Sequence, residues 1–172
     1  MISRKSIALL SGALLMAAPL TAVPAAAAGT SPAPSGQSLA AGWLVHSYNG
    51  KCLEVENSGT GNGDRVQQWD CLGQAGAYWY AEWRGDWKYI KNSRSGKCLE
   101  VENSGTGNGD RVQQWDCLGQ TGALWKAVDA GNGRVRFVNY SGKCLEVENS
   151  GTGNGDRVQQ WDCLGQAGAL WY

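Results

Sequence analysis

Apolar and polar residues alternate along short segments of the chain, which is the pattern of half-buried β-strands. In residues 52–56 (CLEVE), Leu53 and Val55 share one face, and the other three residues share the opposite face. Residues 65–71 (RVQQWDC) form a second such segment, and the turn-forming residues 58–64 (SGTGNGD) lie between the two. The Asn-Gly pair in this connection favours a hairpin because both residues tolerate positive φ. No window shows a sustained helical period, so the pattern predicts an all-β fold.

This pattern occurs three times. The string GKCLEVENSGTGNGDRVQQWDCLGQ occupies residues 50–74, 96–120 and 142–166 without a single difference, and a tryptophan follows each copy. The copies of any residue in the first string therefore lie 46 and 92 positions further along. Such repetition decides the architecture before any local motif does. The predicted repeats span about 41–86, 87–132 and 133–172.

Three units restrict the possible architectures. A solenoid needs atypical terminal repeats, which this chain lacks. The Trp69-Asp70 dipeptide is similar to that of propeller blades, but propellers typically need at least four blades. A compact barrel with threefold symmetry fits best, because each unit then supplies about four strands and buries Leu53, Val55 and Val66 centrally. Closure also removes the free edges of the sheet.

The N-terminal region has the composition of an export signal. Arg4 and Lys5 precede a long apolar run, which ends in small residues just before Gly29. Serine, glycine and proline interrupt the run, so a membrane-spanning helix is the weaker interpretation. The predicted segments are a signal peptide at 1–28, a flexible Ser/Pro/Gly-rich linker at 29–40 and a domain at 41–172.

Charge and composition exclude several partners. The chain has 15 basic and 15 acidic residues, and loss of Arg4 and Lys5 leaves 13 against 15. Because no basic stripe is present, we expect no binding to nucleic acid. No second apolar segment is long enough to span a membrane, so no membrane insertion is expected. We predict a secreted, extracellular monomer without a metal or cofactor.

Six cysteines occur in an exported chain, where disulfides are favoured. Fifteen pairings are possible. Three of them keep the threefold symmetry: the first cysteine of every repeat then pairs with the second cysteine of its own repeat, of the next one or of the one before. The simplest joins Cys52 to Cys71 within the first repeat. Zinc binding is disfavoured because no C-x-x-C spacing occurs.

The candidate functional residues lie beside these cysteines. If Cys52 and Cys71 are bonded, strand alternation brings Glu54, Gln67 and Trp69 together on the face away from the core. An aromatic ring, a carboxylate and a carboxamide suit the apolar face and the hydroxyls of a sugar. In the alternative, Glu54 is a surface acid paired with Lys51 or Arg65, and Trp69 merely covers the disulfide. The copies of the candidate set are Glu100, Gln113 and Trp115, and Glu146, Gln159 and Trp161.

The pattern S-G-K-C-L-x-V … V-Q-x-W-x-C … W, repeated three times, resembles the ricin B-type β-trefoil lectins, also classed as family 13 carbohydrate-binding modules. The resemblance covers the chain from about Trp43 to Tyr172. It implies a β-trefoil and up to three shallow pockets for galactose-type sugars or for polysaccharides such as xylan. It also implies disulfides within each repeat, namely Cys52–Cys71, Cys98–Cys117 and Cys144–Cys163.

The chain departs from the family at the sugar-binding positions. Glu54 stands where the family has Asp, and Gly76 and Ala77 stand where it has Asn and Gln. The missing amide leaves the pockets either inactive or tuned to another glycan. Asp64, Asn57 and Gln74 are alternative sources of the missing contact. We expect Trp79 and its copies to pack in the core, and Gln68, which faces the Leu53 side, to need a polar partner.

Two other functions compete with sugar binding. An enzyme is disfavoured because the one histidine, His46, lies outside the repeated string, and alternation separates Glu54 from Asp70. The glycine-rich GTGNGD lacks the lysine of a phosphate loop. A protein-binding or inhibitory trefoil is the stronger alternative, because the missing amide weakens the case for a sugar. Competition with free sugar discriminates between these functions.

Overall fold

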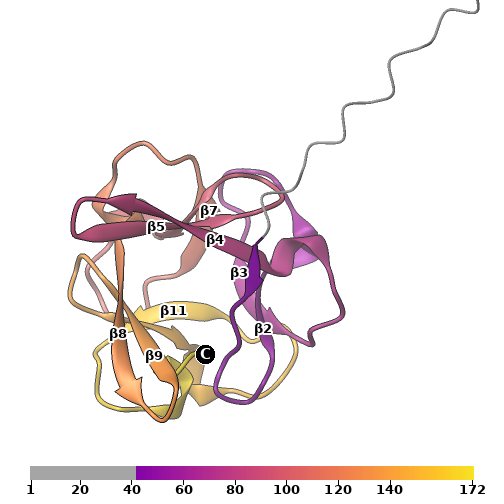
Figure 1. Cartoon of the computed structure of the whole chain (residues 1–172), viewed down its shortest axis with the longest axis vertical. Coiled ribbons are helices and arrows are strands. Elements are labelled where there is room, and N and C mark those ends of the chain that lie inside the picture. Colours follow the sequence, from indigo (N-terminus) through magenta and orange to yellow (C-terminus); the bar gives the residue numbers. More distant parts are fainter. Residues whose placement is uncertain (1–41) are drawn as a thin grey trace, which may run out of the picture. The chain divides into compact units, whose positions relative to one another are not determined.

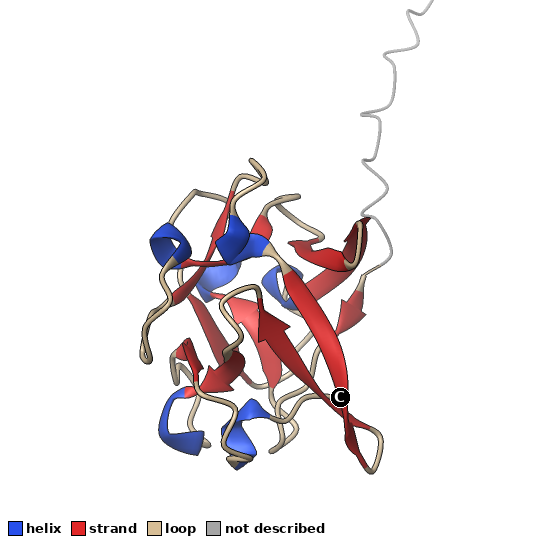
Figure 2. Cartoon of the chain, turned by 90° about the vertical axis from the view of Figure 1, so that its left-hand side faces the viewer, coloured by secondary structure: helices blue, strands red, loops and turns tan. Residues whose placement is uncertain are grey.

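The computed structural model describes residues 42–172, which fold into short strands and single turns of 3-10 helix (Figure 2). No α-helix occurs among these residues, and none of their helices has the length and apolar character to cross a membrane. The all-β prediction is confirmed, whereas the predicted signal peptide and linker lie outside the described residues.

The strands are β1 (Trp43–Leu44), β2 (Cys52–Val55), β3 (Val66–Trp69), β4 (Tyr78–Arg84), β5 (Trp87–Asn92), β6 (Cys98–Val101), β7 (Val112–Trp115), β8 (Trp125–Gly131), β9 (Arg134–Asn139), β10 (Cys144–Val147) and β11 (Val158–Trp161). The 3-10 helices are η1 (Glu56–Ser58), η2 (Ala75–Ala77), η3 (Glu102–Ser104), η4 (Thr121–Ala123), η5 (Glu148–Ser150) and η6 (Ala167–Ala169).

Each repeated string forms the same antiparallel hairpin. In the first repeat, β2 pairs with β3 so that Leu53 lies opposite Gln68 and Glu54 lies opposite Gln67. The pairs β6–β7 and β10–β11 have the identical register. The two predicted strands are therefore present, although the first ends at Val55 because Glu56 already begins η1.

The connection between β2 and β3 is wider than its Asn-Gly pair predicts. Of that pair, only Gly63 takes a positive φ, of 87°. The side chain of Asn62 instead reaches the next repeat: its Nδ2 donates to Asp116 Oδ2 at 2.8 Å, and its Oδ1 accepts from the Asp116 backbone N–H at 3.0 Å. The predicted hairpin is therefore present, but Asn62 makes a contact between repeats instead of taking a positive φ.

The three repeats surround a common centre (Figure 1). The long hairpins β4–β5 and β8–β9 join neighbouring repeats, and β5 pairs with β8 where they meet. Within each repeat, one antiparallel pair also joins a residue near its start to the tryptophan that follows its repeated string. These pairs are Trp43 with Trp79, Lys88 with Trp125, and Val135 with Trp171.

Strand pairing at Trp171 links the third repeat to the first. Trp171 forms bridges with both Ser47 and Val135, and it is as fully buried as Trp79. Backbone hydrogen bonds of 2.8 and 3.0 Å join His46 and Tyr172 in both directions. The pairing around Trp171 therefore matches that of the other two junctions.

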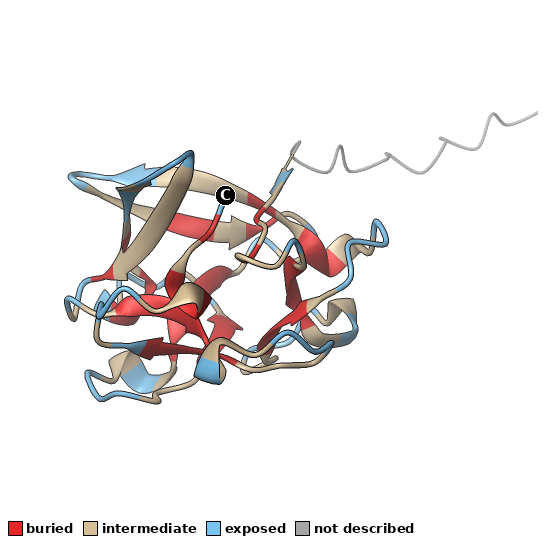
Figure 3. Cartoon of the chain, turned by 90° about the horizontal axis from the view of Figure 1, so that it is seen from below, coloured by how far each residue is buried: buried red, intermediate tan, exposed pale blue. Residues whose placement is uncertain are grey.

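The core lies on the central axis, where the red, buried parts of the strands converge (Figure 3). Leu53, Val55, Val66 and their copies are completely buried, as the alternation predicts. Trp79 is also buried, and its ring N–H donates to the Leu53 carbonyl at 2.9 Å. A buried indole needs such a partner, so Trp79 and its copies are core residues, as predicted.

Buried glutamines connect each repeat to the one before it. Gln114 Nε2 donates to the carbonyls of Gly59 and Gly61, at 3.0 and 3.1 Å, and to Asp64 Oδ2 at 3.1 Å. Its Oε1 accepts from Ser95 Oγ at 2.7 Å. Gln160 repeats these contacts with the second repeat, and Gln68 repeats the amide contacts with the third. The polar partner that Gln68 needs is therefore the backbone of a neighbouring repeat.

Replacing Gln114 with Leu is expected to lower the free energy of unfolding by about 1–3 kcal/mol, because buried carbonyls lose their donor. Urea unfolding measures this change. Thr106→Ala, at an exposed threonine, is the control and should change stability by less than about 0.5 kcal/mol. Equal stability of Gln114→Leu and the control would contradict the role of the glutamine contacts.

Candidate functional site

The predicted residues Glu54 and Gln67 face each other across the β2–β3 hairpin. Contrary to the expectation of an outward-facing set, Glu54 is only 5% exposed and Gln67 only 3%. The 3-10 helix η2 packs against β2 and against η1, which leaves little of this face open. Alternation along the strands predicts the shared face but not the segments that cover it.

The predicted residues converge in a surface hollow, which is well formed in the third repeat. Its volume is about 220 Å³. The lining residues are Glu146, Asn149, Gln159, Trp161, Leu164 and Gln166. Sequence reasoning missed Leu164, which is 77% exposed, since strand alternation carries no signal for a residue in a loop.

Within residues 42–172, Glu54, Glu100 and Glu146 form no ion pair with a lysine or arginine. Lys51 pairs with Asp70, and Arg65 pairs with Glu56 at 2.9 Å. The alternative in which Glu54 is a surface acid paired with one of these cations is therefore wrong. Burial raises the pKa of Glu54 above its ordinary value, although hydrogen bonds from Gln74 and Gln67 oppose the rise. The same balance raises the pKa of both copies of Glu54.

Hydrogen bonding leaves these carboxylates incompletely satisfied. In the second repeat, Glu100 Oε2 accepts from Gln113 Nε2 at 3.3 Å. In the first and third repeats, Oε2 of Glu54 and of Glu146 is buried without a partner in residues 42–172. A buried carboxylate oxygen without a donor is costly, so Glu54 and Glu146 retain capacity to accept a hydrogen bond.

The tryptophans form an open wall of the hollows. Trp161 is 36% exposed. A Cβ atom placed on Gly109, in the loop of the preceding repeat, would lie 3.7 Å from Trp161 Cζ3 and 3.9 Å from Gln159 Oε1. The other two repeats show the same approach. The loop of the preceding repeat therefore approaches the tryptophan and glutamine of each site, and part of the Trp161 ring remains exposed.

The position of the missing amide cannot hold a side chain in this structure. A Cβ on Gly76 would lie 2.8 Å from both Ser58 Cα and the Val55 carbonyl oxygen. The Gly76 backbone N–H donates to Ser58 Oγ at 2.8 Å, which holds η2 against η1. Ala77 is completely buried. The close packing of η2 against η1 therefore requires glycine at position 76, where the family has asparagine.

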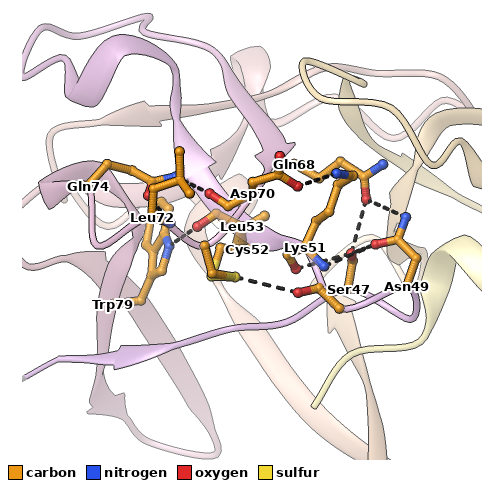
Figure 4. The surroundings of a disulfide bond; sticks show 12 residues. Ser47, Asn49, Lys51, Cys52, Leu53, Gln68, Asp70, Leu72, Gln74 and Trp79 are labelled. Carbon is orange, nitrogen blue, oxygen red and sulfur yellow. Dashed lines mark hydrogen bonds and ion pairs between the residues drawn. A yellow bond between two sulfur atoms is a disulfide. The ribbon is translucent and has the colours of Figure 1, made fainter.

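The three disulfides join cysteines within each repeat, which confirms the predicted pairing. Cys52–Cys71, Cys98–Cys117 and Cys144–Cys163 each have a sequence separation of 19. Figure 4 shows the first, with Gln74 and Trp79 on one side of it and Ser47 and Asn49 on the other. Ligand atoms of His46, Cys52 and Cys71 lie within 4.8 Å of one another. Because both sulfurs are in the disulfide, they are not available as thiolates for a metal.

Residues 40–171 match the family model of the ricin-type beta-trefoil lectin domain. The chain belongs to this family. A search of curated proteins found no match. The match confirms the resemblance to ricin B-type lectins that the repeated sequence motif indicates.

Solved structures support the same assignment. A designed threefold-symmetric protein, ThreeFoil, is 33% identical with a TM-score of 0.72, over 74% of this chain and 94% of its own. An exo-β-1,3-galactanase from Clostridium thermocellum is 27% identical with a TM-score of 0.73, over 77% of this chain but only 29% of the galactanase. The C-half of an earthworm R-type lectin, solved with GalNAc, is 15% identical with a TM-score of 0.60, over 75% of this chain and 94% of its own. This last likeness shows the fold alone.

Proposed function

We propose that this chain is a secreted, non-catalytic lectin that binds a glycan polymer through three equivalent pockets. The observation that carries the proposal is the convergence of Glu146, Gln159 and Trp161 in one hollow of a lectin-family fold. The first and second repeats contain the same residues in the same strand register.

The chemistry of each pocket suits a sugar. The Trp161 ring offers a flat apolar surface for the C–H face of a pyranose. The Glu146 carboxylate accepts hydrogen bonds from hydroxyls, and a carboxamide both donates and accepts. The likeness to a galactanase at 27% identity supports a galactose-type glycan, with xylan as the second polymer to test.

Three weak pockets on one monomer favour polymers over monosaccharides. When one pocket is occupied, the neighbouring sugars of the same chain reach the other pockets at a high effective concentration. We therefore expect strong retention on a polysaccharide and weak binding of the free sugar.

Export and the lack of catalysis rest on separate observations. Three disulfides are typical of proteins that fold in an oxidising compartment. A glycosidase would need two convergent carboxylates, but Asp70 is held by Lys51 and by Asn154 from the third repeat. Glu54 instead lies opposite Gln67.

A protein-binding trefoil is the second candidate. The absence of a side chain at Gly76 favours it, because the usual amide contact to a sugar is lost at that position. Free galactose and xylose discriminate between the two candidates in a pull-down. A lectin releases its polymer when the sugar is added, whereas an inhibitory trefoil keeps its protein partner.

Binding should weaken in acid before the fold does. The raised pKa of Glu54 and its copies means that they take up protons above pH 4.5, the ordinary value, and a protonated carboxyl is a poorer acceptor for hydroxyls. A folded-state pKa above the unfolded value means that the folded state binds protons more tightly, so through this window these groups add stability as pH falls. Retention and thermal unfolding between pH 7 and pH 4 measure both effects. Replacing Glu54, Glu100 and Glu146 together with glutamine should remove the acid dependence of binding in this window. If binding by this variant still weakened in acid, these glutamates would not be its cause.

A further inference from the structure

We infer that Asn57, Asn103 and Asn149 donate and accept the amide hydrogen bonds to the sugar in the three pockets. They do so in place of the amide that the Gly76 position lacks. The inference rests on the proposed carbohydrate binding and names the residue that sets the specificity of each pocket.

The first step concerns the place of Asn149. It lines the hollow of the third repeat together with Glu146 and Trp161. Its backbone has φ 54° and ψ 23°, in the left-handed region. Asparagine tolerates this conformation better than most residues. Asn57 and Asn103 have φ 54° and 55°, so all three η turns present the same side chain in the same way.

The second step compares the amides of the hollow. Gln166 Oε1 accepts from the Leu164 backbone N–H at 2.9 Å, and its Nε2 donates to the Asp162 carbonyl at 2.8 Å. Gln159 Oε1 accepts from Arg157 Nη2 at 3.0 Å. These contacts engage both amide atoms of Gln166 and the oxygen of Gln159, so Gln166 has neither atom free and Gln159 has only its Nε2.

Asn149 differs from both glutamines. Its side chain is exposed and makes no hydrogen bond to any other residue that the structure describes. Both its donor and its acceptor are therefore free to meet a ligand in the hollow.

Asp64, the remaining candidate from the sequence, is already engaged. Its Oδ2 accepts from the Gly61 backbone N–H at 2.7 Å and from Gln114 Nε2 at 3.1 Å. Asp156, its copy in the third repeat, is not among the residues that line the hollow. Of the three candidates, only the asparagine is both in place and free.

The third step explains why the amide moved. Gly76 lets η2 approach Ser58, the neighbour of Asn57 in η1. The same approach that excludes a side chain at Gly76 thus brings η1 to the edge of the pocket. Glu54 is one methylene longer than aspartate, so a sugar bound to it sits further from the strands and nearer to η1. The expected ligand has two neighbouring hydroxyls, one of which donates to the glutamate while the other accepts from the asparagine Nδ2.

The test replaces all three asparagines with glycine. Glycine adopts positive φ freely, so the Asn57→Gly, Asn103→Gly, Asn149→Gly protein should unfold at nearly the same temperature as the wild type. We expect its affinity for soluble β-1,3-galactan or xylan, whichever the wild type binds more tightly, to fall at least tenfold. The matched control replaces the exposed Thr60, Thr106 and Thr152 of the adjoining loop with alanine and should bind like the wild type.

A direct readout accompanies the affinity. In ¹⁵N-labelled wild-type protein, the side-chain amides of the three asparagines should shift when the polysaccharide is added. Wild-type affinity in the glycine variant, or unshifted asparagine amides with bound polymer, would overturn the inference and leave the lectin function standing. A wild type that binds neither polymer would overturn both.

Discussion

Replacing Trp69, Trp115 and Trp161 together with alanine is expected to abolish retention on polysaccharide. Each ring forms the wall on which a sugar stacks, and an aromatic contact of this kind contributes about 1 kcal/mol beyond the area that it buries. Linked sites can raise the overall avidity about 10²–10⁴-fold above the affinity of a single site, and weakening every site removes this gain. A single replacement should therefore weaken retention about tenfold or more, and the triple replacement should remove it. Sedimentation with insoluble polymer measures the loss.

The control for this prediction is another exposed tryptophan. Trp83, on β4, is 68% exposed and does not line the hollow of the third repeat. Trp83→Ala should bind as the wild type does. Circular dichroism must show that the triple variant keeps its β-structure, since all three rings lie outside the buried core. Undiminished retention by a folded triple variant contradicts the placement of the sugar against these rings.

Removing the disulfides is expected to have the largest effect on stability. Each closes a loop with a sequence separation of 19, which corresponds to about 3 kcal/mol in the chain-entropy model. Replacing both cysteines of one repeat with alanine should therefore lower the free energy of unfolding by about 3 kcal/mol. Loss of all three disulfides approaches the total stability of a domain, about 5–15 kcal/mol, so the reduced chain should be largely unfolded at 37 °C.

The threefold repetition supplies the internal control. The three bonds close equal loops in identical strings, so the three double variants should lose similar amounts of stability. Urea unfolding with and without a reductant measures the effect. An equal urea midpoint for the oxidised and reduced proteins is the outcome that contradicts the prediction.

The core of the fold could be predicted from the sequence. Alternation in CLEVE and RVQQWDC places Leu53, Val55 and Val66 on one face, and the repetition extends this assignment to every unit. The three-unit count then excludes the architectures that need more blades. Such local periodicity is a strong signal because a slip of one residue would expose the whole apolar face.

The sequence could not predict the contacts between repeats. The sequence predicts that Gln68 needs a polar partner but not which one; its amide donates to backbone carbonyls 83 and 85 positions away. The burial of Glu54 depends in the same way on η2 packing against β2. The sequence also carries no sign that Asn62, in the connection between β2 and β3, hydrogen-bonds to Asp116 of the next repeat. Each of these features depends on tertiary packing, which overrides local preference.

The part of the site that alternation could predict is the shared face of Glu54, Gln67 and Trp69. Its depth and its loop residues could not be predicted, because η1 and the segment after the disulfide approach it only in the folded chain. Leu164 and Asn149 complete the hollow from those segments.

The most direct test of carbohydrate binding is a glycan array that includes insoluble polysaccharides, probed with the protein in its fully disulfide-bonded form. We predict selective binding that free sugar competes away, strongest for polymers of galactose or xylose. An array without any sugar-competable signal, from protein shown to be folded, would contradict the lectin function and make a protein partner the leading hypothesis.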